Sequence, residues 1–385
     1  MKKIYYLGYY DIPENKSENR NIVLSATNKM TYIIEALEKC DCSVEVVSTA
    51  HTSNLRSYPE KIIQIGAYSS LRLFKSTRWG NKIRRIISVL YTRYQYEKYI
   101  LDNLTPEDTL IVYHSVDYAD FIVKAKKKID FRLILEVEEI YADVNGKENE
   151  RIKENKVFES ADAYIFPTKL LDDKLNVDKK PSIIIHGTYK VEPQVVDKFN
   201  DGRVHIVYAG TFDPRKGGTV AAETARFLDE NYHIHILGFG NKSDRDNLLN
   251  EINRTSKLSS CKITFDGLLS GSDYTKFIQR CHIGLSPQNP NASFNATSFP
   301  SKVLSYMANG LRVVCIRIPA IEKSAVGKYM FFYDEQTPIA VAQTIKNIDF
   351  TEHYDSRVKI ENLNINFIGN LKNFLNFNGE ESKNE

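Results

Sequence analysis

The stretch VHIVYAGTFDPRKGG, Val204–Gly218, decides how the chain is predicted to fold. It begins with a short run rich in β-branched and aromatic residues, which is typical of a buried strand, and this run ends at Gly210. The loop that follows carries Arg215 and Lys216 before two further glycines. Ligands of open α/β sheets bind at the carboxyl ends of strands, so this loop is a candidate binding loop. The alternative is an ordinary polar turn whose cations face water.

The same pattern, a short apolar run followed by a longer amphipathic segment, recurs over most of the chain. The other candidate strands are KIYYLGY, CSVEVVS, TLIVYHS, RLILEVE, DAYIFPT, PSIIIHG, YHIHILGFG, CKITFDG, HIGLSPQ and RVVCIRI. This alternation predicts an α/β protein with parallel sheets, and a length of 385 residues suits two domains. We predict two doubly wound Rossmann-like domains facing a cleft.

The polar stretch VEPQVVDKFNDGR, residues 191–203, shows no periodicity and is predicted to be a linker. We therefore place an N-terminal domain at residues 1–195 and a C-terminal domain at residues 203–355. Residues 356–377 form an amphipathic segment that we expect to be a helix returning to the N-terminal domain. The polar residues 378–385 are expected to be disordered.

The overall composition narrows the classes of function. The chain has 52 Lys and Arg against 49 Asp and Glu, a net charge of +3, which is far from the basic composition of a dedicated nucleic-acid binder. Five cysteines in a large chain, without paired metal-site spacing, are interpreted as reduced thiols. Neither a signal peptide nor a membrane-spanning run is expected from the apolar pattern. We expect a cytoplasmic protein, either soluble or peripheral on the inner face of the cell membrane.

The stretch SFPSKVLSYMANGLRVV, residues 298–314, is typical of a helix start followed by a buried strand. Pro300 suits the first turn, with Ser298 or Phe299 at the cap. Free backbone N–H groups at such a terminus, together with the helix dipole, bind anions. The groups predicted to be free are those of Ser301, Lys302 and Val303. The alternative is a well-capped buried helix without a ligand.

Two glycine turns follow other predicted strands of the C-terminal half. HILGFGN places Gly238 just beyond a strand, but a lone Gly-x-Gly lacks the full dinucleotide fingerprint, so the pattern favours a tight turn. TFDGLLSG places a turn at Gly267 and Leu268. Both turns would lie at the same edge of the predicted sheet as the loop after Gly210.

Taken in order, VYAGTFDPRKGG, HILGFGN, ITFDGLLSGSDYTKFIQRCHIGLSPQ and SFPSKVLSYMANGLRVV resemble the nucleotide-sugar-dependent glycosyltransferases of GT-B fold. The resemblance is greatest to the family 4 type and its bacterial surface-polysaccharide branch. That family has an Arg after the strand-end glycine and a Lys shortly after it, and both neutralise the donor diphosphate. Lys216 matches the Lys, whereas Thr211 stands at the Arg position.

The family also has two glutamates separated by seven residues, which contact the donor sugar and the ribose. The resemblance places Thr297 and Ser305 at these positions, so both carboxylates are absent. This difference leaves the sugar specificity open more than the diphosphate site. It also keeps open a non-catalytic GT-B protein that binds a glycan or a partner enzyme.

The resemblance implies a donor site in the C-terminal domain. Lys216 and Lys302 are the predicted catalytic cations, and Gly267 with Leu268 would contact the base. The full set of predicted donor-binding residues is Gly210, Thr211, Arg215, Gly238, Gly267, Leu268, Thr297, Pro300, Ser301, Val303 and Ser305. The donor is expected to be a UDP-sugar, used by a retaining hexosyltransferase with no metal and no further cofactor.

The N-terminal domain is expected by the same resemblance to bind the acceptor. Gly8 and Tyr9 end the first predicted strand, and His114 at another strand end is a candidate general base. Glu138 and Glu139 follow a third strand, where a carboxylate could deprotonate an acceptor hydroxyl. The alternatives are a hydrogen-bonded structural histidine and solvated strand-end charges.

Residues 71–100, LRLFKSTRWGNKIRRIISVLYTRYQYEKYI, combine many cations with aliphatic and aromatic residues, including Trp79. An amphipathic basic helix of this kind suits an anionic membrane surface, where a lipid-linked acceptor would be found. The alternative is a helix packed on its domain with a solvated basic edge.

The predicted function is transfer of a sugar from a nucleoside diphosphate sugar to a hydroxyl acceptor. The expected process is synthesis of capsule, exopolysaccharide or another cell-surface glycan, and the expected partners are the nucleotide sugar and a glycan or lipid-linked acceptor, without nucleic acid. The competing hypotheses are the non-catalytic binding protein and a nucleotide-sugar epimerase of the same fold.

Overall fold

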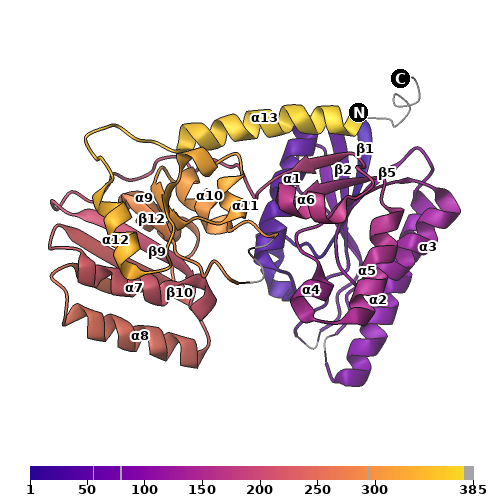
Figure 1. The fold of residues 1–385 in the computed structure, drawn as a ribbon. Coiled ribbons are helices and arrows are strands. Elements are labelled where there is room, and N and C mark those ends of the chain that lie inside the picture. Colours follow the sequence, from indigo (N-terminus) through magenta and orange to yellow (C-terminus); the bar gives the residue numbers. More distant parts are fainter. Residues whose placement is uncertain (55, 79, 293–294, 296, 377–385) are drawn as a thin grey trace. The chain divides into compact units, whose positions relative to one another are not determined.

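The computed structural model describes residues 1–385 except 55, 79, 293–294, 296 and 377–385. The chain forms two compact units (Figure 1). Unit 1 consists of Met1–Thr188 together with the C-terminal segment from Asn366, and unit 2 is Tyr189–Ile365. The expected disordered tail at 378–385 and the interfacial Trp79 lie outside the described residues.

Unit 1 is built on an eight-stranded sheet in the order β3-β4-β2-β1-β5-β6-β7-β8. Its strands are β1 (Lys2–Leu7), β2 (Cys42–Ser48), β3 (Lys61–Gln64), β4 (Ser69–Leu73), β5 (Thr109–Tyr113), β6 (Arg132–Glu136), β7 (Ala163–Phe166) and β8 (Ser182–Ile184). All neighbours are parallel except β3, which runs antiparallel to β4 at the edge. The strand order reverses between β1 and β5, so the carboxyl ends of these strands border the topological switch point.

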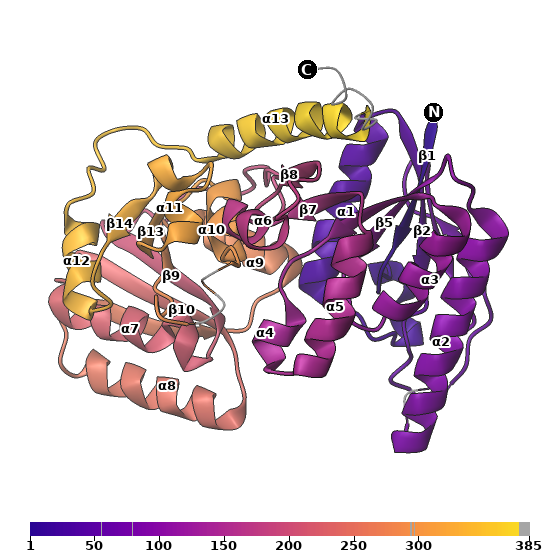
Figure 2. The ribbon, with the colours of Figure 1, turned by 45° about the vertical axis from the view of Figure 1, so that its right-hand side comes forward.

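The helices of unit 1 follow the parallel strands, as the alternating sequence pattern predicts. They are α1 (Leu24–Lys39), α2 (Lys82–Asn103), α3 (Ala119–Ile129), α4 (Tyr141–Asn145), α5 (Glu148–Ser160) and α6 (Lys169–Leu175), with a 3₁₀ helix at Pro13–Glu18. Helices α2, α3 and α5 pack in succession along the unit (Figure 2). The buried core lies between these helices and the sheet, and it includes Tyr96, Tyr118 and Phe121.

Unit 2 has a six-stranded parallel sheet in the order β11-β10-β9-β12-β13-β14. Its strands are β9 (Val204–Thr211), β10 (Tyr232–Phe239), β11 (Lys262–Gly267), β12 (Ile283–Ser286), β13 (Arg312–Ile316) and β14 (Phe331–Tyr333). Its helices are α7 (Gly218–Glu223), α8 (Lys242–Ser256), α9 (Gly271–Arg280), α10 (Ser301–Ala308), α11 (Pro319–Glu322) and α12 (Pro338–Lys346), with 3₁₀ helices at Pro214–Lys216, Thr224–Phe227 and Gly327–Tyr329. This is the doubly wound order with its switch point between β9 and β12.

Helix α13 (Arg357–Asn376) begins in unit 2 and ends in unit 1. At its start, the Arg357 guanidinium donates to the carbonyls of Glu192 and Asn309. Near its end, the Leu375 carbonyl accepts hydrogen bonds from Lys2 and Arg132. The predicted linker, 191–203, forms neither helix nor strand and lies within unit 2.

The described cysteines are free and buried. None of the helices in the described part of the chain combines the length and apolarity needed to cross a bilayer.

Candidate functional site

The carboxyl edge of the unit 2 sheet brings two loops together at the switch point. The loop after β9 and the loop after β12 meet where the Asn289 amide donates to the Arg215 carbonyl at 2.8 Å. Gly217 has a φ of 82°, and a Cβ there would lie 1.7 Å from the Pro287 carbonyl oxygen. Glycine is therefore required for this approach, and it fixes the loop after β9 against the loop after β12.

Two glycines leave the ends of β9 and β10 without side chains. Gly210 on β9 and Gly238 on β10 are direct register partners. Gly238 has a φ of 140°, and a Cβ at this position would lie 1.8 Å from the Gly210 carbonyl oxygen. A Cβ on Gly210 would lie 2.9 Å from Lys302 Nζ. The two predicted glycines thus leave space at the strand ends, and the Lys302 ammonium group lies next to it.

Helix α10 holds Lys302 at this edge. The Tyr306 hydroxyl accepts a hydrogen bond of 2.8 Å from the Ala209 amide, which anchors the helix on β9. Lys302 Nζ is buried 4.2 Å from the ring centre of Tyr208, and it has no hydrogen-bond acceptor among the described residues. Burial, and then the charge of Lys216, lower the pKa of Lys302 to about 7. An anion here would supply the missing partner and favour the charged ammonium form.

The start of α10 corrects one part of the prediction. Pro300 is the N-cap residue with extended backbone, and the helix begins at Ser301. The Val303 amide donates to the Pro300 carbonyl at 3.0 Å, so it is already bonded within the chain. The amides of Ser301 and Lys302 remain the candidates for holding a phosphate.

Arg215, which follows Thr211 in the same loop, is paired with a carboxylate of that loop. Its guanidinium forms a bidentate pair with Asp213, with Nη2 2.6 Å from Oδ2 and Nε 3.0 Å from Oδ1. The charge of Arg215 is therefore compensated locally. Thr211 contributes a backbone carbonyl that accepts a hydrogen bond of 2.8 Å from the Tyr208 hydroxyl.

The two positions where the resemblance implied carboxylates present hydroxyl side chains. The Ser305 hydroxyl lies 3.2 Å from the Tyr274 hydroxyl, and Thr297 is partly buried in the loop before α10. Nearby, Gln288 donates to the Asn295 side-chain carbonyl at 2.6 Å. Gly267 ends β11 with a φ of 82°, and Leu268 beside it is exposed. These groups offer hydrogen bonds and one apolar surface to a ligand.

At the carboxyl edge of the unit 1 sheet, Glu136 ends β6 with its side chain fully buried. It accepts a hydrogen bond from the Tyr6 hydroxyl, and its Oε1 lies 3.9 Å from Lys29 Nζ. Lys29 also pairs with Glu138 and donates to the Ile185 carbonyl at 3.2 Å. Burial raises the pKa of Glu136 to about 7, against the opposing effect of the Lys29 charge. Lys29 was not singled out in the sequence, although a Lys among the apolar residues of α1 was a usable signal.

His114 does not have the surroundings of a general base. Its side chain is buried, and Nε2 lies 2.8 Å from the Glu154 carboxylate. That carboxylate also accepts hydrogen bonds of 2.8 Å from the amides of Tyr141 and Ala142. These contacts support the structural alternative, because the ring joins β5 to α4 and α5 and is closed to solvent.

The remaining residues predicted to bind the acceptor are Gly8, Tyr9 and Glu139. A Cβ on Gly8 would lie 2.7 Å from Met30 Cε, so glycine lets α1 approach the end of β1. The Tyr9 ring lies 5.2 Å from the ring of Tyr118, and Glu139 is partly buried beside Glu138.

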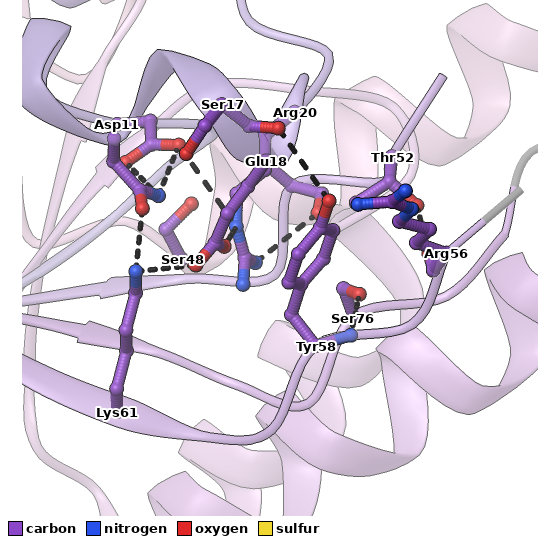
Figure 3. Close-up of polar contacts among 12 residues, drawn as sticks. Asp11, Ser17, Glu18, Arg20, Ser48, Thr52, Arg56, Tyr58, Lys61 and Ser76 are labelled. Atoms are coloured by element: carbon purple, nitrogen blue, oxygen red, sulfur yellow. Dashed lines mark hydrogen bonds and ion pairs between the residues drawn. The ribbon is translucent and has the colours of Figure 1, made fainter. Parts of the chain in front are cut away.

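A second polar cluster on unit 1 was not anticipated (Figure 3). Figure 3 shows the Lys61 ammonium and the Arg20 guanidinium directed at Glu18, which pairs with both. Arg20 Nε also lies 3.9 Å from Asp11, and its Nη2 is buried without a partner among the described residues. The cluster joins segments that are distant in the sequence, and no local motif indicates it.

The comparisons with known proteins agree with this architecture. Residues 203–348, which make up most of unit 2, match the family model described as "Glycosyl transferases group 1". No curated protein sequence matches the chain.

Several solved structures are similar over almost the whole chain. One is an E. coli structure described as trehalose-6-phosphate bound with UDP-2-fluoro glucose (9% identity, TM-score 0.71, covering 97% of this chain and 98% of that chain). Another is a sucrose-phosphate synthase from Thermosynechococcus elongatus (11%, TM-score 0.70, 97% and 98%). A third is a trehalose-6-phosphate synthase studied for enzymatic glycosyltransfer with retention (10%, TM-score 0.67, 97% and 97%). The chain has the GT-B fold, as predicted.

Proposed function

We propose that the protein is a glycosyltransferase that transfers a sugar from a UDP-sugar to a hydroxyl of a cell-surface glycan. The observation that carries this proposal is the buried ammonium of Lys302 at the switch point of unit 2, which has no hydrogen-bond acceptor in the part of the chain that the structure describes. A buried ammonium without a hydrogen-bond acceptor is unfavourable, so its retention at a strand-end site favours an anionic ligand. The group 1 family match and the UDP-sugar bound in the E. coli structure support a nucleotide sugar as that ligand.

The chemistry that these groups would supply is stabilisation of the leaving group. Negative charge develops on the diphosphate as the glycosidic bond breaks, and preorganised cations and N–H groups lower the energy of that state. The groups proposed to stabilise this charge are the ammonium groups of Lys302 and Lys216 and the first backbone amides of α10. A retaining outcome is supported by the retention described for a trehalose-6-phosphate synthase of the same fold.

The acceptor is proposed to bind at the carboxyl edge of the unit 1 sheet. Glu138 is the reachable carboxylate there, with its side chain 28% exposed and held by Lys29. Glu136 lies behind it and is closed to solvent. A carboxylate held in this way can accept a hydrogen bond from an acceptor hydroxyl.

The exposed side chains of helix α2 favour the proposal that the protein binds the cytoplasmic face of a membrane. One face of it exposes Ile83, Ile86, Ile87, Leu90 and Tyr94, each by 55 to 69%. Lys82, Arg84 and Arg85 are exposed on the same turns. Apolar side chains beside cations match an anionic bilayer surface, and we propose that the acceptor there is lipid-linked.

The proposal is tested by nucleotide-induced thermal shift. We expect UDP to raise the unfolding midpoint of the wild type, and Lys302→Met to abolish this rise. Because the variant removes a buried ammonium that has no hydrogen-bond acceptor among the described residues, its midpoint without ligand should equal or exceed that of the wild type. Lys346→Met, an exposed lysine in the last turn of α12, is the matched control and should keep the full response.

The competing functions give different results in the same experiment. Failure of uridine, guanosine, adenosine and thymidine diphosphates to shift the wild type would contradict the donor site. If UDP binds but the protein releases no UDP from any of a panel of UDP-sugars, with or without glycan acceptors, the non-catalytic binding protein would be favoured. Conversion of the donor sugar without acceptor or UDP release would favour an epimerase.

A further inference from the structure

Three histidines form a cluster at the amino-terminal ends of β9 and β10, away from the strand ends that form the proposed donor site. His205 and His233 are direct register partners, and His235 lies two residues further along β10. Alternation along a strand therefore places all three on one face of the sheet. Their exposures are only 2, 5 and 3%, and one ring nitrogen from each lies within 4.8 Å of the others.

A ring nitrogen of one histidine lies beside a ring nitrogen of another, and the second nitrogen of each of these two rings contacts a carboxylate. His205 Nδ1 lies 2.9 Å from His235 Nε2. The outer nitrogens meet carboxylates, His205 Nε2 at 2.8 Å from Asp201 and His235 Nδ1 at 3.1 Å from Asp266. An ionised carboxylate only accepts hydrogen bonds, and a neutral imidazole has a single N–H. If both N–H groups are donated outward, two lone pairs face each other, and a cation between them is required.

The third ring contacts a hydroxyl instead of a carboxylate. The Thr264 hydroxyl donates to Asp266 at 2.8 Å, so its oxygen is available to accept from His233 Nε2 at 3.0 Å. This leaves His233 Nδ1 with the lone pair. A ligating histidine whose other N–H is held by an oxygen acceptor is the usual arrangement of histidine metal sites.

Aromatic rings cover the cluster. Phe199, from the segment before β9, stacks on His205 with ring centres 4.1 Å apart, and Phe277 meets His235 edge-on at 5.1 Å. The Phe199 amide is fixed by the Arg280 carbonyl at 2.8 Å. The Asp201 side chain remains 46% exposed and marks the route to solvent.

We propose that His205, His233 and His235 bind a zinc ion that fastens the segment carrying Phe199 and Asp201 onto the unit 2 sheet. Neutral imidazole nitrogens suit Zn²⁺, whereas Mg²⁺ and Ca²⁺ prefer oxygen ligands. Zinc–nitrogen bonds of about 2.0 Å hold two nitrogens roughly 3 Å apart, which is near the separation of His205 and His235. The role is structural, and it is independent of the proposed donor chemistry.

The experiment uses the full chain without a histidine tag, stripped with a chelator and titrated with Zn²⁺ against a chromophoric competitor. We expect one zinc ion per chain, a higher unfolding midpoint with Zn²⁺ and no change with Mg²⁺. Co²⁺ in place of Zn²⁺ should give the visible d–d absorption bands of a cobalt ion bound by imidazole nitrogens. No zinc binding by the wild type would overturn the proposal and leave a shared proton as the cation between the rings.

Variants distinguish this site from adventitious binding. His205→Gln and His235→Gln should lower zinc affinity more than a hundredfold. Asp201→Asn removes only an exposed outer partner, so it should fold normally and weaken binding about 10- to 100-fold. His353→Gln, an exposed histidine in the same unit, is the matched control. Zinc affinity unchanged in both Asp201→Asn and His205→Gln would overturn the proposal, whatever the response to UDP.

Discussion

At the scale of single residues, one buried ionisable group in each unit has a strongly shifted pKa. Lys302 in unit 2 and Glu136 in unit 1 are both removed from water, and burial moves the pKa of each to about 7, from opposite directions. Each group therefore changes charge near neutral pH. Two measurable consequences follow, one for ligand binding and one for stability.

Lys302 should take up a proton when UDP binds. Its pKa is about 7 in the free protein, so at pH 8 the side chain is mostly neutral, and a bound diphosphate raises that pKa. We expect proton uptake approaching one per UDP at pH 8 and falling toward zero at pH 6. Calorimetry in buffers of different ionisation enthalpy measures this quantity. Uptake that is the same at both pH values, or that persists in Lys302→Met, would argue against a diphosphate beside this ammonium.

Glu136 should make unit 1 less stable as pH rises. Its folded pKa of about 7 lies above the ordinary value of 4.5, so between these values the native state holds a proton that the unfolded chain has released. The free energy of unfolding should fall with pH across this window and then level off. Glu136→Gln keeps an acceptor for the Tyr6 hydroxyl and should flatten the decline, as measured by urea unfolding at pH 5 and 7.5. The exposed Glu148→Gln should retain the wild-type slope.

At the scale of elements, α2 and α10 show how one sequence pattern can be interpreted in two ways. The run 71–100 contains β4 up to Leu73 and helix only from Lys82. Within α2 the buried residues are Ser88, Thr92, Tyr96, Tyr99 and Ile100, so the first turns leave their isoleucines in solvent. In α10 the apolar side chains are buried as the structural alternative predicts, yet its Lys302 lies at the site edge.

The exposed face of α2 should bind anionic vesicles. Each Lys or Arg near such a surface contributes about 1 kcal/mol, so neutralising Lys82, Arg84 and Arg85 together should lower vesicle affinity roughly a hundredfold. Sedimentation with phosphatidylserine-containing vesicles measures this loss, and Ile86→Ser should add to it. Ile152→Ser on α5, another exposed isoleucine of unit 1, is the control. Equal binding by the charge-neutral variant and the wild type would rule out the membrane role.

At the scale of the whole molecule, the strands that were predictable are those with strong local signals. The runs containing β1, β9 and β10 are apolar and bounded by glycine, and their order gave the GT-B expectation that the structural comparisons confirm. The short edge strand β3, KIIQ, was not predicted, because it has only four residues and pairs with β4, a strand that directly follows it and was not predicted either.

The candidate site likewise contains some features with a local sequence signal and others without one. Gly238 could be predicted from the sequence because a strand-end glycine is a local signal, and the structure gives the close approach to Gly210 as its cause. The pairing of Arg215 with Asp213 and of Glu18 with Arg20 and Lys61 could not, since side-chain pairing depends on folded geometry. The predicted roles in catalysis and in donor and acceptor binding remain predictions.

The hydrogen bonds from Lys2 and Arg132 to the carbonyl of Leu375 have a consequence for synthesis of the chain. Unit 1 is assembled from the first 188 residues and from a helix segment that starts at Asn366. At about 5 to 20 residues per second, a ribosome needs on the order of ten to forty seconds to make the intervening chain. During that interval the surface of unit 1 that Phe367, Leu371 and Leu375 later cover is exposed to solvent. Unit 1 therefore begins to be translated first and is completed last.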